Sequence, residues 1–156
     1  MVEQRVIDML KHHEGVRTRW YYCPANLITQ GVGHVLYPEQ AKLPFAERRK
    51  FQIKPEDDRE WTMQEVEEVL KRDLVRFERA VDRLCPKTTP GQRGALISFA
   101  FNVGAGSLQR STLRAKHNRG EYEDAAKEFL KWAKGGGKVL PGLLKRRNDE
   151  VALYLS

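Results

Sequence analysis

One long helix, predicted from residue 62 to residue 84, constrains the fold more than any other stretch. It begins with Thr62-Met63-Gln64-Glu65, in which a threonine hydroxyl and a glutamate carboxylate can satisfy each other's free backbone amides. Apolar residues then recur every three or four positions, with no Gly or Pro before Pro86. They are Val66, Val69, Leu70, Leu74, Phe77, Val81 and Leu84. A helix of about 22 residues spans roughly 33 Å, which is more than one half of a small protein needs, so we expect it to join two lobes.

The stretch before this helix has two kinds of pattern. Residues 2–13 place apolar side chains at helical spacing, and Gly15 is a suitable end for that helix. Residues 16–36 combine aromatic and β-branched residues with turn-forming Pro, Asn and Gly, which predicts a small, irregular antiparallel sheet. Residues 37–59 are polar and interrupted by prolines, and we predict a loop there with one short helix at most.

The stretch after the long helix predicts helix throughout. Thr89-Pro90-Gly91-Gln92 repeats the helix-start signal. Residues 90–103 are apolar nearly all round and are predicted to be the buried centre of a C-terminal lobe. Gly104-Ala105-Gly106 is predicted to end this helix. Three shorter helices are expected near residues 109–118, 122–132 and 141–155.

Together these elements predict an α+β fold in one domain, residues 1–156. An N-terminal lobe of about residues 14–60 holds the small sheet, and the connecting helix covers about residues 62–84. An all-helical C-terminal lobe covers about residues 86–156, and the helix of residues 2–13 is expected to pack on it. This arrangement predicts a cleft between the lobes, and the long helix makes hinge opening between them plausible.

Charge and hydropathy narrow the possible partners. Lysines and arginines outnumber acidic residues by 28 to 21, and the net charge of +7 favours nucleic acid, an acidic membrane surface or a bacterial wall polymer. No helix has a dense basic face interleaved with aromatic residues, so we expect no nucleic-acid partner. The first helix lacks the unbroken apolar run of a signal peptide or membrane span. We therefore expect folding in the cytoplasm where the chain is made, without stable membrane insertion.

Neither disulfides nor a metal centre is expected. Cys23 and Cys85 form no framework, and a reducing compartment keeps both as thiols. His12 and His13 are adjacent, so on a helix they would point about 100° apart, which is poor for chelating one ion. We expect no metal, no cofactor and a monomer.

The stretch from His13 to His34 carries the candidate chemistry. Glu14 has aromatic and aliphatic neighbours in sequence, and a carboxyl in such a setting can keep its proton and act as a general acid. Cys23 needs positive neighbours to be reactive, which Arg17 and Arg19 can supply. Taken singly, however, each candidate also has an ordinary interpretation: a solvated glutamate, an inert buried thiol and, at Thr29, a strand residue.

What distinguishes these residues is their joint spacing: Glu14, eight residues, Cys23, five residues, Thr29, and then Gly31-Val32-Gly33-His34. This pattern resembles the signature of the phage-type lysozymes of glycoside hydrolase family 24. Two later segments are similar to that family's buried helix and closing segment. They are LISFAFNVGAGSLQRSTL, from Leu96 to Leu113, and FLKWAKGGGKVLPGLLKRR, from Phe129 to Arg147. The resemblance covers most of the chain and implies a lysozyme-like α+β fold.

The resemblance also implies roles for matching positions. Glu14 would be the general acid that protonates the glycosidic oxygen, while Cys23 and Thr29 would hold a water on the opposite face of the sugar. His34 would pair with Asp73 on the long helix, as a stabilising tie rather than a catalytic pair. The other implied positions are Val35, Phe101, Asn102 and Ser111 as substrate contacts, and Arg146 as a residue that holds Glu14. For Asn102, capping the end of its own helix is an equal alternative.

The implied reaction is that of an endolysin, which hydrolyses the β-1,4 bond between N-acetylmuramic acid and N-acetylglucosamine in peptidoglycan. If the second group positions water, the two groups lie roughly 6.5–9.5 Å apart and configuration inverts, whereas direct attack needs about 5–5.5 Å and retains it. The resemblance favours inversion. Because Cys23 stands where many members have aspartate, a lytic transglycosylase and a catalytically weakened wall-binding protein stay open as alternatives. An endolysin of this kind would wait in the host cytoplasm and reach the wall after membrane permeabilisation.

Overall fold

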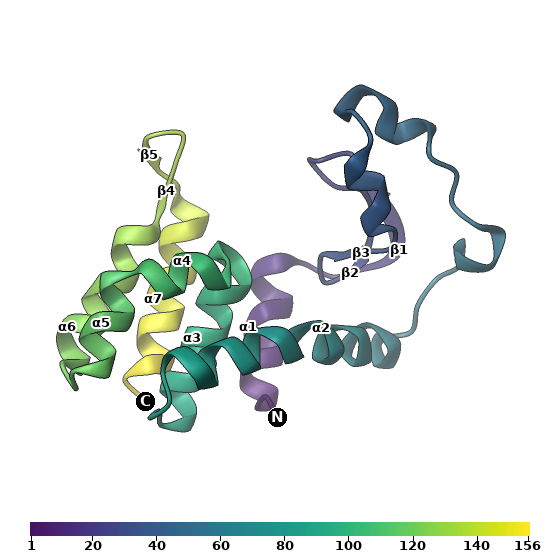
Figure 1. Cartoon of the computed structure of the whole chain (residues 1–156). Coiled ribbons are helices and arrows are strands. Elements are labelled where there is room, and N and C mark those ends of the chain that lie inside the picture. Colours follow the sequence, from purple (N-terminus) through teal and green to yellow (C-terminus); the bar gives the residue numbers. More distant parts are fainter. The chain divides into compact units, whose positions relative to one another are not determined.

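The computed structural model describes all residues 1–156, and the chain is followed from purple to yellow in Figure 1. It divides into two compact units. The helical unit comprises Met1–Val6 and Leu74–Ser156, and the sheet unit comprises Ile7–Asp73. Both unit boundaries fall inside helices, α1 (Gln4–Glu14) and α2 (Met63–Leu84). None of the helices is both long and apolar enough to cross a membrane.

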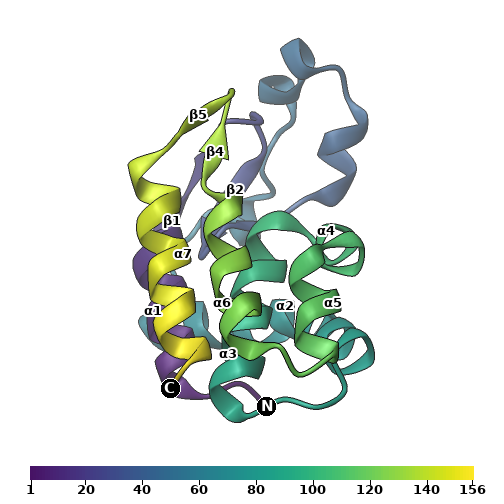
Figure 2. The same cartoon turned by 90° about the vertical axis from the view of Figure 1, so that its left-hand side faces the viewer.

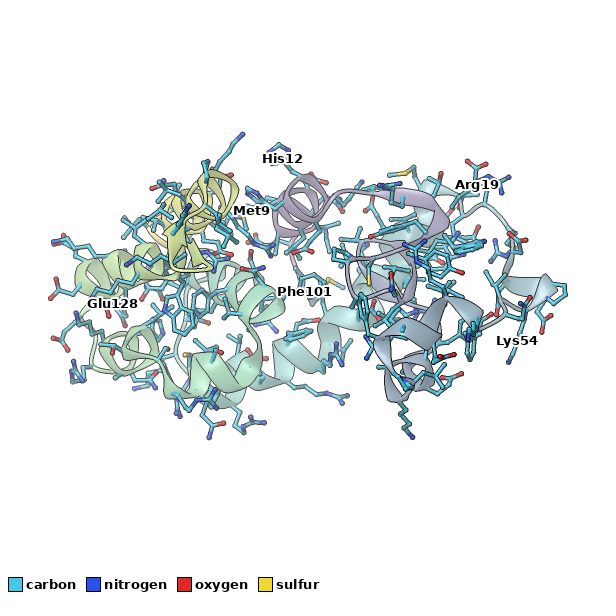
Figure 3. The ribbon with its side chains drawn as sticks, turned by 90° about the horizontal axis from the view of Figure 1, so that it is seen from above. Met9, His12, Arg19, Lys54, Phe101 and Glu128 are labelled. Carbon is cyan, nitrogen blue, oxygen red and sulfur yellow. The ribbon has the colours of Figure 1, made fainter.

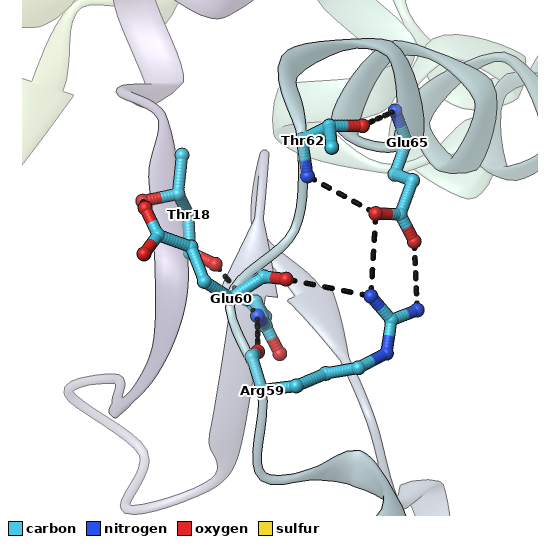
Figure 4. Close-up of polar contacts among 6 residues, drawn as sticks. Thr18, Arg59, Glu60, Thr62 and Glu65 are labelled. Atoms are coloured by element: carbon cyan, nitrogen blue, oxygen red, sulfur yellow. Dashed lines mark hydrogen bonds and ion pairs between the residues drawn. The ribbon is translucent and has the colours of Figure 1, made fainter.

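The long helix α2 begins as predicted. Oγ1 of Thr62 accepts a hydrogen bond from the backbone N–H of Glu65, and the Glu65 carboxylate accepts one from the N–H of Thr62, both at 3.1 Å. The guanidinium of Arg59 also holds this carboxylate, at 2.7 Å, and lowers the pKa of Glu65 to about 2. Figure 4 shows these contacts together with the link between Thr18 and the segment before α2. The backbone N–H of Trp61 donates to the carbonyl of Thr18 at 2.8 Å, which ties the start of α2 to the sheet.

The sheet unit contains the small, irregular antiparallel sheet that the sequence predicted. Its strands are β1 (Arg17–Tyr22), β2 (Ile28–Gly31) and β3 (His34–Val35), with β2 in the centre. The irregularity is a register shift in β1 between Arg17 and Tyr21. Thr29 in β2 is paired with Tyr21 on one side and with Val35 on the other. All four residues of β2 are buried, so this strand is the core of the unit.

The last residue of β2, Gly31, has a backbone conformation and a close neighbour that leave no room for a side chain. Its φ is +70°, and a Cβ built on it would lie 2.9 Å from Cζ3 of the Trp61 ring. A side chain at this position would therefore combine a left-handed backbone with a collision against an indole that is itself buried. The Gly-x-Gly pattern is thus explained at Gly31 by close packing.

Residues 37–59 correct the expectation of a loop with one short helix. They form three 3₁₀ helices: η1 (Pro38–Lys42), η2 (Phe45–Lys50) and η3 (Pro55–Asp57). Pro38 and Pro55 stand at the starts of two of them, where the missing N–H costs nothing. The segment lacks the apolar repeat that would sustain an α-helix, so single turns form instead.

The helical unit is built around α3 (Pro90–Val103), whose predicted capping box between Thr89 and Gln92 is present. Its buried residues pack against α7 (Pro141–Tyr154). Helices α5 (Thr112–Asn118) and α6 (Tyr122–Phe129) pack against each other, and α6 also packs against α7 (Figure 2).

Two further expectations for this unit were wrong. Gly104, with φ +96°, ends α3 but also begins α4 (Ala105–Arg110), so the helix expected at 109–118 is two helices. The expectation of an all-helical lobe is also wrong. After α6 the chain continues through η4 (Leu130–Trp132) into a hairpin of β4 (Lys134–Gly135) and β5 (Lys138–Val139). Gly136 and Gly137, with φ of +60° and +80°, supply the tight turn that such a hairpin needs.

Charged side chains form a buried network in the helical unit. Arg147 and Glu150 are fully buried, and the Arg147 Nε lies 2.8 Å from Oε1 of Glu150. The hydroxyl of Ser98 donates to the other carboxylate oxygen of Glu150, and Arg146 donates to the carbonyl of Ser98 at 3.1 Å. The network joins α3 to α7 through charged groups that have little access to water.

Candidate active site

Glu14 is the last residue of α1, and its carboxylate lies beside the turn between β2 and β3. A Cβ built on Gly33, which has a φ of +66°, would lie 3.9 Å from Oε2 of Glu14. The side chain of Glu14 is exposed. The apolar setting that the sequence suggested for this carboxyl is therefore not found, and the carboxylate is open to solvent and to a ligand.

Cys23 lies in the turn that joins β1 to β2. Its N–H donates to the carbonyl of Leu27 at 3.0 Å, and its carbonyl accepts from the N–H of Asn26 at 2.8 Å. Asn26 adopts a φ of +58°, which closes the turn. The backbone on both sides of Cys23 is therefore fixed, and the thiol is half-buried.

Thr29 holds the thiol from the neighbouring strand. Its hydroxyl donates to the carbonyl of Leu27 at 2.8 Å and also lies within hydrogen-bond reach of the Cys23 sulfur. Burial raises the pKa of the Cys23 thiol, but the contacts of the thiol with the Thr29 side chain and with the backbone of Leu27 and Ala25 outweigh this effect. The pKa of Cys23 is therefore lowered, and the thiolate fraction near neutral pH is larger than for a free cysteine.

The arginines expected to activate Cys23 serve other partners. The guanidinium of Arg17 lies over the ring of Tyr21, 4.6 Å from its centroid, and Arg19 pairs with Glu60 at 3.6 Å. Hydrogen bonds rather than cations favour the thiolate, which corrects the expectation from the sequence.

Tyr21 links the acid to the thiol. Its pKa is raised, first by burial and further by the charges of Cys23 and Glu14, against the opposing charge of Arg17. Both candidate groups are thus close enough to act on one phenol, which also pairs with Thr29 across the sheet. Sequence reasoning missed Tyr21 as a site residue, because its position depends on a strand register that the sequence alone does not give.

Gln40, which lies in η1, holds the turn that contains Cys23 in place. Its side chain is fully buried, and its carbonyl oxygen accepts from the N–H of Ile28 at 2.9 Å. Its amide nitrogen donates to the carbonyls of Asn26, at 3.1 Å, and Arg48, at 2.9 Å. Arg48 in turn donates to the carbonyl of Ala25 at 2.9 Å. Residues 37–59 therefore support the ribbon between Cys23 and Thr29.

Replacing Gln40 by Leu is expected to lower the free energy of unfolding by about 1–3 kcal/mol, because the buried N–H of Ile28 loses its acceptor. Urea denaturation followed by circular dichroism measures this. Gln52→Leu is the matched control, since Gln52 is exposed and forms no hydrogen bond, and it should change stability by less than about 0.5 kcal/mol. Equal effects of the two variants would show that the Gln40 contacts contribute little.

His34 and Asp73 form the contact that the resemblance implied. Nδ1 of His34 lies 2.7 Å from Oδ2 of Asp73 on α2. Both side chains line a cavity of about 350 Å³ in the sheet unit, with Trp61 and several charged residues around it. The pair ties β3 to α2, which is the stabilising role that the resemblance implied.

The implied substrate residues of the helical unit have the following surroundings. Phe101, labelled in Figure 3, packs edge-on against Phe77 with ring centroids 5.4 Å apart. Asn102 is exposed and accepts a hydrogen bond from Arg147 at 2.8 Å, whereas Gly104 caps the helix. Ser111 is buried and its hydroxyl caps α5. Val35 in β3 is half-buried and Arg146 is buried. The contacts of Val35, Phe101, Asn102 and Ser111 with sugar, and the hold of Arg146 on Glu14, stay predictions.

The sequence of this chain is similar to that of known phage proteins. Residues 11–150 match the model of the phage lysozyme family. The endolysin of Bacillus phage B103 is 37% identical over 158 residues, which cover 99% of this chain and 54% of the relative. The chain thus spans about half the length of that relative. The endolysin of Acyrthosiphon pisum secondary endosymbiont phage 1 is 29% identical over 160 residues, which cover 99% of this chain and 98% of the relative.

Solved structures agree with these sequence matches. The crystal structure of a P22 lysozyme mutant is 29% identical, with a TM-score of 0.81, and the match covers 100% of this chain and 99% of that one. The endolysin of Escherichia coli O157:H7 phage FAHEc1 is 25% identical with a TM-score of 0.80, covering 100% and 94%. The predicted lysozyme-like α+β fold is confirmed by these matches. The chain belongs to the phage lysozyme family, which the spacing from Glu14 to His34 led us to expect.

Proposed function

We propose that this chain is a muramidase that hydrolyses the β-1,4 bond between N-acetylmuramic acid and N-acetylglucosamine in peptidoglycan, with Glu14 as the general acid. Membership of the phage lysozyme family supports the enzyme class. The single observation that supports the residue roles is the position of Tyr21 in the sheet unit: it pairs with Thr29 across the sheet, and the charges of Glu14 and Cys23 both raise its pKa.

Glu14 would deliver its proton to the glycosidic oxygen. In the free protein this side chain is exposed, so a bound saccharide can reach it. The carboxyl would donate as the glycosidic bond breaks. The proton leaves with the departing sugar oxygen, and positive charge develops at the anomeric carbon.

Cys23 and Thr29 would hold the water that attacks this carbon. The Cys23 sulfur lies near the Thr29 side chain and the backbone around Leu27 and Ala25, and it would accept a hydrogen bond from the attacking water. Water that attacks from the face opposite Glu14 inverts the configuration. In this proposal the thiolate takes the place of the carboxylate that an aspartate would supply, as an acceptor rather than as a nucleophile.

Replacing Cys23 by Ser is expected to slow the release of reducing ends from purified walls by roughly 100-fold, because a serine hydroxyl stays uncharged and general-base assistance is lost. Cys23→Asp should keep most of the activity. Cys85→Ala is the control: this thiol is buried, burial raises its pKa to about 11, and its replacement should leave the rate unchanged. Full activity of Cys23→Ser, with an unchanged melting temperature, would remove the thiol from the mechanism.

A lytic transglycosylase is the second candidate, because a reaction that needs only one acid/base group fits a site with one carboxylate and no aspartate at position 23. The mass of the products tests both functions. Hydrolysis of purified peptidoglycan gives N-acetylmuramic acid with a reducing end, whereas a transglycosylase gives the anhydro sugar, which is one water lighter. Binding to walls with neither product would indicate a catalytically weakened wall-binding protein.

The setting of the reaction is also a proposal. The names of the relatives support an endolysin that acts on the wall of the bacterium in which it is made. We propose that the chain waits in the host cytoplasm as a monomer and reaches peptidoglycan after the membrane is permeabilised. Val35, Phe101, Asn102 and Ser111 are the proposed substrate contacts, and Arg146 the proposed support of Glu14.

A further inference from the structure

The net positive charge of the chain comes from one unit. In the helical unit 17 lysines and arginines stand against nine acidic residues, whereas in the sheet unit 11 stand against 12. The sheet unit, which carries the carboxylate, thiol and hydroxyl of the candidate active site, is therefore close to neutral. Attraction to an anionic partner must come from the helical unit.

A cavity of about 440 Å³ in the helical unit concentrates part of this charge. Arg83 near the end of α2, Lys87 in the following loop and Arg114 on α5 line it, with Asn118 and Tyr122 beside them. No carboxylate lines this cavity. Arg83 and Lys87 form no ion pair, and both are exposed. The basic pocket, as we call it, therefore holds three cations that no acidic group neutralises.

Arg114 is fixed in position at this pocket. Its Nε donates to the carbonyl of Leu84 at 3.0 Å and its Nη1 to the carbonyl of Gln109 at 3.2 Å. These two bonds orient the guanidinium and leave Nη2 available as a donor. A guanidinium that is held in place loses little freedom when it binds an oxyanion, so this arrangement favours binding.

His117 anchors the wall of the pocket without adding charge. Its Nε2 donates to the carbonyl of Lys87 at 2.8 Å, and its Nδ1 accepts from the hydroxyl of Tyr154 at 2.6 Å. Burial lowers the pKa of His117, so the ring is neutral at physiological pH. The backbone of Lys87 is thus tied to α5, which holds the lysine on the same rim as Arg114.

We propose that the basic pocket binds a phosphate group of an anionic wall polymer. Phosphate oxygens accept several charge-assisted hydrogen bonds, and arginine and lysine are the side chains best suited to donate them. The cavity of about 440 Å³ has room for more than a single ion, as a phosphate within a polymer needs. The choice of a wall polymer as the source rests on the proposed function at the wall, whereas phosphate binding itself does not. The pocket would keep the enzyme on its substrate surface during repeated cleavage.

Binding of lipid-free poly(glycerol phosphate) to the full chain, followed by isothermal titration calorimetry, tests the proposal. The variant that combines Arg83→Gln with Lys87→Gln should bind at least roughly tenfold more weakly, since two charge-assisted contacts are lost. The matched control combines Lys127→Gln with Lys145→Gln. These two lysines are exposed on α6 and α7 of the same unit and form no ion pair, and the control removes the same charge. It should bind within about twofold of the unaltered chain.

Three outcomes would overturn the proposal. Equal weakening in both double variants would mean that the surplus charge acts without a site. Unchanged binding in the Arg83/Lys87 variant would exclude the pocket. Binding to vesicles of anionic phospholipid, but not to the polymer, would assign the pocket to a lipid headgroup instead of the wall. Hydrolysis of polymer-free peptidoglycan is measured alongside, so that a failure of the proposed muramidase activity is distinguished from a failure of phosphate binding.

Discussion

Glu14→Gln is expected to reduce the hydrolysis of purified peptidoglycan by at least about 1000-fold, within the range seen when a general acid is removed. Glutamine keeps the size of the side chain but has no acidic proton, so the departing sugar oxygen would leave as an alkoxide. The side chain is exposed at the end of α1, and the change should therefore alter the free energy of unfolding by less than about 0.5 kcal/mol. Release of reducing ends measures the rate, and thermal denaturation checks the fold.

A suitable control for this variant is Glu39→Gln. Glu39 is also exposed and lies in the sheet unit, in η1. It is distant in sequence from Tyr21, Cys23 and Thr29, and its side chain has no hydrogen bond or ion pair. Its replacement makes the same chemical change and should leave the rate as it was. If Glu14→Gln kept a tenth or more of the activity, the general acid would have to be another group.

Glu150→Ala is expected to destabilise the protein by about 3–5 kcal/mol, the range found when one partner of a buried ion pair is removed. Arg147 is fully buried and would keep its charge without the carboxylate 2.8 Å away, and the hydroxyl of Ser98 would lose its acceptor. The melting temperature should fall by on the order of 10 °C. Far-UV circular dichroism during heating measures this loss.

Two further variants serve as comparisons for the stability of Glu150→Ala. Glu123→Ala, at an exposed position on α6, should change stability by less than about 0.5 kcal/mol. The double change of Arg147→Met with Glu150→Leu should recover only part of the loss, because it removes two charges and refills the space but leaves buried Arg146 without the carboxylate 3.4 Å away. A loss below about 1 kcal/mol in Glu150→Ala would mean that water reaches the network and that its burial contributes little. Since Arg147 also donates to Asn102, activity of the double variant reports whether that contact matters for the substrate.

Local sequence signals predicted the elements that depend on local physics. The capping boxes at Thr62 and Thr89 and the apolar repeat of α2 each involve residues within one turn of one another, and all three are present. The hairpin of β4 and β5 was missed because two-residue strands carry no periodic pattern, and glycines that turn a hairpin are the same residues that break a helix. The 3₁₀ turns of residues 37–59 were missed for a similar reason.

For the candidate site, the sequence named side chains whose catalytic roles stay predictions, and it did not indicate their electrostatic surroundings. The spacing of Glu14, Cys23 and Thr29 identified three side chains that the structure relates to one another through Tyr21 and the sheet register. The guanidinium of Arg17 lies over the ring of Tyr21, 4.6 Å from its centroid, a pairing that no sequence pattern indicated. The sequence did not indicate the role of Gln40, because the partners of a buried amide are known only once the chain has folded.

In the proposed reaction, Glu14 donates a proton on one face of the sugar while a water held by Cys23 and Thr29 attacks the other. The anomeric form of the first product distinguishes this reaction from direct attack on the sugar. Proton NMR of a purified glycan fragment, recorded within the first turnovers and before mutarotation, reads this form. We expect the α-anomer of N-acetylmuramic acid from the β-linked substrate, and initial release of the β-anomer would rule out this mechanism.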